Sequence, residues 1–109
     1  MAEMSIKLTD NSDLFKDASD DAIARALEKV GLTAESYAKM KCPVDTGRLR
    51  NSITHEVNNE TVYIGTNVEY AAYVEMGTVN TRAQPFLRPA ASNHGSVYRS
   101  LIEDELKGD

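Results

Sequence analysis

The chain has 109 residues, of which 41% are hydrophobic and 27% are charged, and its formal net charge is −5. These values are ordinary for one small globular domain, and the negative charge argues against a protein that coats duplex DNA, which usually needs a basic surface. No apolar run approaches the length of a membrane span, so we expect no membrane partner. A core of this size is modest, and assembly with further copies would stabilise it.

The residue types of common catalytic and metal sites are sparse in this sequence. Cys42 is the one cysteine and cannot form an internal disulfide, so we interpret it as a small packing residue. His55 and His94 have no second ligand at metal-binding spacing. Phosphate-binding loops, metalloprotease helices and nucleophile elbows are absent. We therefore expect no catalytic residue, no metal and no cofactor.

The N-terminal part predicts a strand followed by a long helix. Residues 4–8 alternate between apolar and polar side chains, which is typical of a half-buried strand. Over residues 13–40, apolar side chains recur at steps of three and four, which predicts an amphipathic helix. Gly31 costs about 1 kcal/mol relative to Ala in a helix interior, so we expect a bend there.

A short connection divides this helical pattern from an alternating one. Pro43 ends the long helix, because proline is not tolerated in a helix interior. Asp45 and Thr46 are favoured N-caps, since their side-chain oxygens can accept the first N–H groups of a new turn. Leu49 and Ile53 lie four residues apart, on one face of the short helix that this cap would start.

The alternating pattern that follows predicts a β-hairpin. Residues 53–57 and 61–66 each place apolar side chains at every second position. The intervening Asn58, Asn59 and Glu60 are turn-forming residues. His55 lies on the first strand, where we expect a structural or exposed histidine.

The C-terminal third predicts two helices around a loop. Residues 69–76 have apolar side chains at helical spacing, and Gly77 suits a C-cap. Residues 78–84 have no apolar period and predict a loop that is poorly ordered in the free protein. Pro89 is well placed as a first helical residue, and residues 90–106 predict a closing helix.

Together these elements predict an α+β fold. A long N-terminal helix and a C-terminal helix would pack on a small antiparallel sheet that contains a β-hairpin. We expect a single domain over residues 1–109.

Two functions other than a structural one remain open. Asp45-Thr46-Gly47 is also the catalytic triplet of aspartic proteases, in which paired carboxylates share a proton and activate water. The chain could supply half of a dimeric protease with Asp45 as the catalytic residue, although the triplet follows a helical pattern where an apolar strand is needed. A second alternative is a nucleic-acid-binding or toxin-like module that uses the local basic group, namely Lys39, Lys41, Arg48 and Arg50.

Three motifs in sequence order resemble those of the tailed-phage head–tail joining family, also called minor tail or tail-completion components. The motifs are PVDTGRLRNSI at 43–53, YAAYVEMGT at 70–78 and QPFLRPA at 84–90. The resemblance covers roughly residues 23–106. Gln84 departs from the family, which often has a basic residue before Pro-Phe-Leu.

The resemblance implies a non-enzymatic virion protein that acts in head–tail joining or tail completion. Several copies would form a ring at the end of the tail tube, in the tail or neck of the virion after assembly in the host cytoplasm. Its partners would be other phage tail and head-connector proteins, without tight nucleic-acid binding. We expect the protein contacts to involve Arg48, Arg50, Tyr70, Tyr73, Arg82, Phe86 and Arg88.

Overall fold

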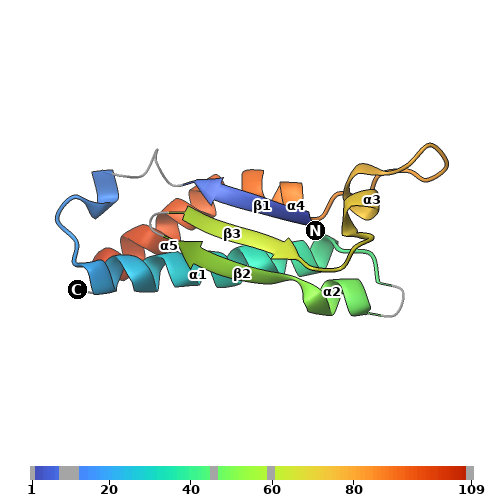
Figure 1. Cartoon of the computed structure of the whole chain (residues 1–109). Coiled ribbons are helices and arrows are strands. Elements are labelled where there is room, and N and C mark those ends of the chain that lie inside the picture. Colours follow the sequence, from blue (N-terminus) through green and yellow to red (C-terminus); the bar gives the residue numbers. More distant parts are fainter. Residues whose placement is uncertain (1, 8–12, 45–46, 59–60, 108–109) are drawn as a thin grey trace.

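The computed structural model describes residues 2–7, 13–44, 47–58 and 61–107. These segments contain three strands and five helices (Figure 1). In chain order they are β1 (Ala2–Lys7), α1 (Asp20–Lys41), α2 (Arg48–Ser52), β2 (Thr54–Asn58), β3 (Thr61–Thr66), α3 (Ala71–Met76), α4 (Leu87–Ser92) and α5 (Gly95–Lys107). The predicted α+β class is confirmed.

The three strands form one antiparallel sheet in the order β1-β3-β2. The predicted hairpin is confirmed, since β2 and β3 are neighbours and Val57 pairs with Val62. β1 contains the described part of the strand predicted at residues 4–8 and pairs with the other edge of β3. The turn residues 59–60 lie outside the described segments.

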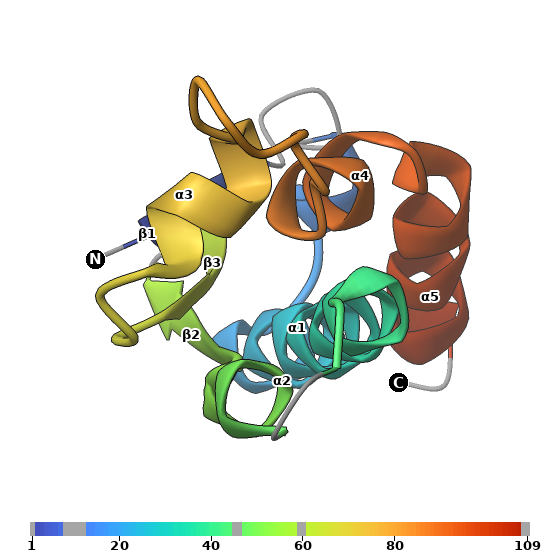
Figure 2. The same cartoon turned by 90° about the vertical axis from the view of Figure 1, so that its right-hand side faces the viewer.

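Helices cover one face of this sheet. α1 packs against β2 and β3, α4 packs against β1 and β3, and α5 lies along α1 on the side away from the strands (Figure 2). The fold is elongated, with extents of 51 × 21 × 19 Å. The core lies between the layers, and its largest fully buried side chains are Leu27, Val30, Val62, Ile64, Phe86, Leu87, Tyr98 and Ile102.

The long helix begins later than its apolar pattern predicts. Asp13 to Phe15 form a separate 3₁₀ turn, and α1 starts only after Ser19, whose hydroxyl accepts the Ala22 N–H at 3.1 Å. That hydroxyl satisfies one of the free N–H groups at the helix start, so Ser19 fixes the first turn. The predicted start at residue 13 is wrong, because a 3₁₀ turn also places apolar side chains three residues apart.

The predicted C-terminal helix is divided into α4 and α5. The Asn93 N–H donates to the Pro89 carbonyl at 2.9 Å and closes α4. His94 then stacks on Tyr37 of α1, with ring centroids 3.7 Å apart. The hydroxyl of Tyr98 donates to the Ala90 carbonyl and ties α5 back to α4. Pro89 is the third residue of α4, which starts at Leu87, so its prediction as the first helical residue is wrong. The single helix predicted over residues 90–106 is also wrong, since the chain turns where His94 reaches Tyr37.

A histidine of β2 contacts two carboxylates of α1 at a point where a glycine leaves room. His55 Nδ1 lies 2.8 Å from Glu35 Oε1, and its Nε2 lies 2.6 Å from Glu28 Oε2. A Cβ atom at Gly31 would lie 2.4 Å from the ring carbon Cδ2 of His55. The expected structural histidine is therefore present. α1 is a continuous helix through Gly31, and the glycine allows the close approach of β2.

The hydrogen bonds of this cluster favour the charged forms of His55 and Glu35. Burial lowers the pKa of His55, but the hydrogen bonds to Glu28 and Glu35 together outweigh it, so the pKa lies above its ordinary value. Burial raises the pKa of Glu35, but its bonds to His55 and Lys39 outweigh it, so that pKa is lowered. Both ring nitrogens face carboxylate oxygens, which suits the doubly protonated imidazole.

We expect Gly31→Ala to destabilise the protein, because the new Cβ would overlap the His55 ring. Overpacking of this kind costs about 1–3 kcal/mol, which exceeds the gain of about 1 kcal/mol in helix propensity. Gly95→Ala is the matched control, since nothing lies within 4 Å of a Cβ added there. Urea unfolding measures both variants. Equal stability of the two variants would contradict the close approach, and adding His55→Ala to Gly31→Ala should relieve the loss.

We expect the contribution of His55 to stability to depend on pH. Its folded-state pKa is raised, so the contribution is complete below about pH 6.5 and is lost as the pH rises through the folded pKa. Glu35 has the opposite sign, and its contribution is lost as the pH falls through its lowered pKa. The free energy of unfolding of wild type and His55→Gln, measured from about pH 5 to about pH 9, should converge at the alkaline end. A constant difference would contradict this assignment.

Candidate protein-interaction site

Most residues expected to contact partners lie at one end of the elongated fold. This end is formed by α2, α3 and the loop that follows α3 (Figure 1). Arg50 on α2, Tyr73 on α3, Arg82 in the loop and Arg88 on α4 are exposed. Phe86 is placed differently, because its side chain is 0% exposed and belongs to the core.

The short helix α2 depends on a glycine. Gly47 occupies the N-cap position with φ 87°, a left-handed conformation that suits a residue without Cβ. Its carbonyl accepts the Asn51 N–H at 2.9 Å. No side chain caps this helix at Gly47. The proposed caps Asp45 and Thr46 lie outside the described residues.

Two hydroxyl groups fix α2 to the end of β3. The hydroxyl of Ser52 donates to the Leu49 carbonyl at 2.6 Å and shares a hydrogen bond with the hydroxyl of Thr66. The same Thr66 oxygen accepts the Val68 N–H at 3.1 Å. Thr66 is buried, so these contacts hold α2 beside the chain that leads into α3.

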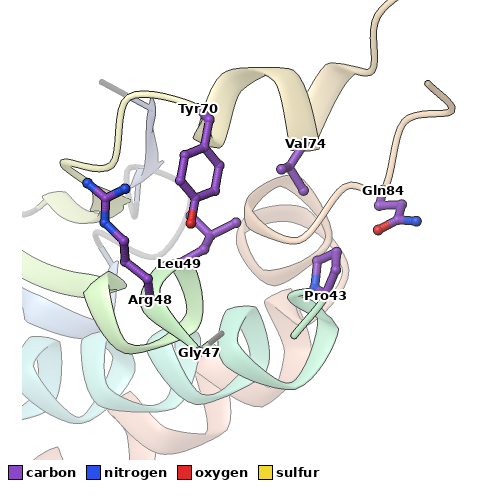
Figure 3. A pocket seen from close by; sticks show the side chains of 7 residues that line it. All are labelled: Pro43, Gly47, Arg48, Leu49, Tyr70, Val74 and Gln84. Carbon is purple, nitrogen blue, oxygen red and sulfur yellow. The ribbon is translucent and has the colours of Figure 1, made fainter. Parts of the chain in front are cut away.

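A cleft of about 530 Å³ opens between α2 and α3 (Figure 3). Its lining is mainly apolar and consists of Pro43, Gly47, Arg48, Leu49, Tyr70, Val74 and Gln84. The guanidinium of Arg48 lies 5.5 Å from the centre of the Tyr70 ring and 3.6 Å from a carboxylate oxygen of Glu69. Arg48 and Tyr70, both predicted contact residues, therefore meet at the rim of one cleft.

A buried carboxylate fixes α3 to α4. Glu75 is 8% exposed, and its two oxygens accept the backbone N–H groups of Phe86, Leu87 and Arg88 at 3.0, 2.8 and 3.1 Å. These are the first three of the four N–H positions that a helix start leaves free, and the fourth residue, Pro89, has no N–H. Glu75 thus supplies the N-terminal cap of α4 from another helix.

Sequence reasoning did not single out Glu75. One signal was present, since Glu75 lies four residues after the buried Ala71 and therefore on the buried face of α3. A charged residue on such a face needs a partner. The sequence did not reveal that the partner is the start of a helix.

The loop at residues 77–85 extends from this end and is closed by backbone hydrogen bonds. Gly77 is the predicted C-cap, with φ 78°, and a Cβ there would lie 2.7 Å from the Ala83 nitrogen. The Thr78 N–H donates to the Thr81 carbonyl at 2.9 Å, and the Gln84 N–H donates to Val74 at 2.8 Å. Residues 78–85 are all exposed. Poor order in the free protein stays a prediction.

The exposed surface of this end is rich in apolar side chains. Among the described residues, six large apolar side chains are exposed, and one of them, Leu32, lies in the middle of α1. The other five lie at the end that carries the cleft and are Met40, Val44, Tyr73, Met76 and Val79. In the part of the chain that the structure describes, large exposed apolar side chains are therefore more numerous at this end than elsewhere.

Two cations of the nucleic-acid alternative have carboxylate partners within the chain. Lys39 lies 3.0 Å from Glu35, and Arg48 contacts Glu69 and Tyr70. Cys42 beside them is buried, and burial raises the pKa of its thiol, which fits a packing residue rather than a reactive one.

No three His, Cys, Asp or Glu side chains of the described residues come together in a way that could hold a metal ion. None of the helices that the structure describes has the length and apolar character needed to span a bilayer.

The described residues define a small α+β fold with a cleft and exposed apolar side chains at one end. Residues 6–77 match the family described as "Bacteriophage HK97-gp10, putative tail-component". The match covers more than half of the chain, from β1 to the C-cap of α3, and the chain belongs to this family of phage tail components. It is therefore a tail-related structural protein of a phage. No curated protein and no solved structure matches the chain.

We expect Glu75→Ala to destabilise the protein, because three backbone N–H groups at the start of α4 would lose their acceptor. An unsatisfied buried donor costs about 1–3 kcal/mol. Glu75→Gln keeps one acceptor oxygen and should lose less. Glu69→Gln is the control, since the Glu69 side chain is 78% exposed. Urea unfolding and amide exchange at Leu87 and Arg88 measure the effect. Exchange rates unchanged from wild type in Glu75→Ala would rule out the cap.

Proposed function

We propose that this chain acts in head–tail joining or tail completion as a non-enzymatic virion protein. Several copies form a ring at the end of the tail tube and contact other tail or head-connector proteins. The chain is located in the tail or neck of the particle, after assembly in the host cytoplasm. The observation that carries this proposal is the family match over residues 6–77.

The geometry of the site supports an assembly role. The matched region includes α2 and α3, which line the cleft, together with the first motif and all but the last residue of the second. Apolar side chains gathered at one end of a small domain are normally covered by a partner. A ring of copies beside other tail proteins would supply such a partner and would add buried area to a modest core.

The protease alternative has less structural support. The catalytic triplet of that class needs a buried loop after an apolar strand, so that two carboxylates can approach and share a proton. Here the segment between Pro43 and Gly47 follows the helix α1 and leads into the helix α2. Asp45 itself lies outside the described residues.

The nucleic-acid alternative is weakened by the surroundings of its cations. Lys39 and Arg48 each have a carboxylate partner in the chain, and the overall charge is −5. A Lys or Arg side chain strengthens duplex binding when it neutralises a phosphate group and displaces the counterions held there. We therefore assign the exposed Arg50 to contacts with carboxylates of a partner protein, which the planar guanidinium suits. Arg48, together with its partner Glu69, would lie at the rim of the same contact.

We expect an Arg48→Ala/Arg50→Ala double variant to lose head–tail joining without any loss of DNA binding, because the wild type should bind duplex weakly at low salt. Joining is measured by adding purified protein to tails and heads from particles that lack it, and binding by fluorescence anisotropy with a short duplex. The matched control is Lys16→Ala/Lys107→Ala, which removes the same charge from exposed positions at the other end.

The assembly role and the nucleic-acid alternative predict opposite outcomes of this experiment. Normal joining by the control and failed joining by the arginine variant support the assembly role. Micromolar duplex binding with a steep salt dependence, lost in the arginine variant, would replace it with the nucleic-acid reading. Absence of the chain from purified particles would also reject the proposed function.

A further inference from the structure

The loop at residues 77–85 presents an apolar side chain that no other described residue covers. Val79 is 101% exposed at the tip of the loop. Figure 1 shows the loop extending beyond α3 and away from the sheet. Its hydrogen bonds from Thr78 to Thr81 and from Gln84 to Val74 close the turn and hold its base. These bonds place the apolar tip away from the rest of the described chain.

The same end of the molecule contains a hollow for such a tip. Leu49, Tyr70 and Val74 supply apolar walls to the cleft of about 530 Å³ between α2 and α3 (Figure 3). That volume falls within the range of about 300–1,000 Å³ that holds compact ligands. The complete exposure of Val79 shows that this side chain does not occupy the cleft of its own chain, although Gln84 at the base of the loop lines it.

The charges of the tip and of the cleft rim do not oppose entry of the tip into the cleft. Val79 and Asn80 at the tip are uncharged, and Arg82 is the loop's one charged residue. At the rim, Arg48 already has Glu69 as a partner, so docking would not bury an unpaired charge there. The exposed Tyr73 and Met76 lie on the helix beside the loop, where a docked copy would cover apolar surface.

We infer that the loop at residues 77–85 of one copy inserts Val79 into the cleft between α2 and α3 of a second copy. In the ring arrangement the contact is heterologous: the tip of each copy enters the hollow of the next, and the chain of contacts closes where the rotation permits. This inference rests on the ring arrangement proposed above and names the surfaces that form it.

Disulfide trapping tests the contact directly. Val79→Cys and Val74→Cys variants are prepared separately, one of them isotope-labelled, then mixed and oxidised mildly. We expect a mixed disulfide dimer, detected by mass spectrometry, at a several-fold higher yield than with Leu32→Cys in place of Val79→Cys. Leu32 is a matched control because it is exposed, at 52%, but lies in the middle of α1. The native Cys42 is buried and should contribute little.

A second pair of variants tests the same contact without cysteine chemistry. Val79→Asp removes the apolar tip, and Gln84→Trp places a large ring at the mouth of the cleft. Each variant alone should lose self-association, whereas a mixture should form a one-to-one complex, because each supplies the surface that the other lacks. A mixed disulfide yield no higher than the Leu32→Cys control, together with normal self-association of Val79→Asp, would overturn the inference.

The outcome separates this inference from the proposed function. If wild type and Val79→Asp both complete tails and no mixed disulfide forms, the loop contact fails and the assembly role stands. If the mixed disulfide forms but the chain is absent from particles, the contact stands and the assembly role fails.

Discussion

The close approach of other elements to α1 is the constraint on which the rest of the structure depends. The buried face of this helix consists largely of small residues, which are Ala22, Ala26, Gly31, Ala34 and Ala38. Small side chains let the sheet, α4 and α5 pack near the helix axis, so one helix can organise three neighbours in a chain of 109 residues. Gly31 is the extreme case, because the His55 ring occupies the space that any Cβ would take.

Buried hydrogen bonds fix the elements of the candidate site relative to one another. Glu75 fixes the start of α4 relative to α3, so both ends of the intervening loop leave from packed helices. Thr66 joins α2 to the chain that leads into α3, through Ser52 and Val68. The cleft between α2 and α3 therefore has walls that are set by hydrogen bonds as well as by apolar packing, whereas the loop beyond it contacts mainly itself and solvent.

The sequence also indicated the kind of surface that this end presents. The first two motifs of the resemblance contain the turn at Gly47, the cleft residues Arg48 and Tyr70, and the C-cap Gly77. Both glycines have positive φ, so backbone sterics alone favour them at these positions. The third motif differs from its prediction, because Phe86 packs into the core and Pro89 is the third residue of α4 rather than the first.

The sequence by itself determined the elements whose signal is local. Apolar periodicity was sufficient for most of α1, for the hairpin and for α3, because each pattern repeats within one element. Only the tertiary structure decided where the C-terminal helix breaks: the stacking of His94 on Tyr37 accompanies the division of α4 from α5. It also decided that Glu75 caps a distant helix and that His55 meets two carboxylates of α1. These contacts join residues that the sequence separates by 11 to 57 positions, and a spacing rule reaches only a few.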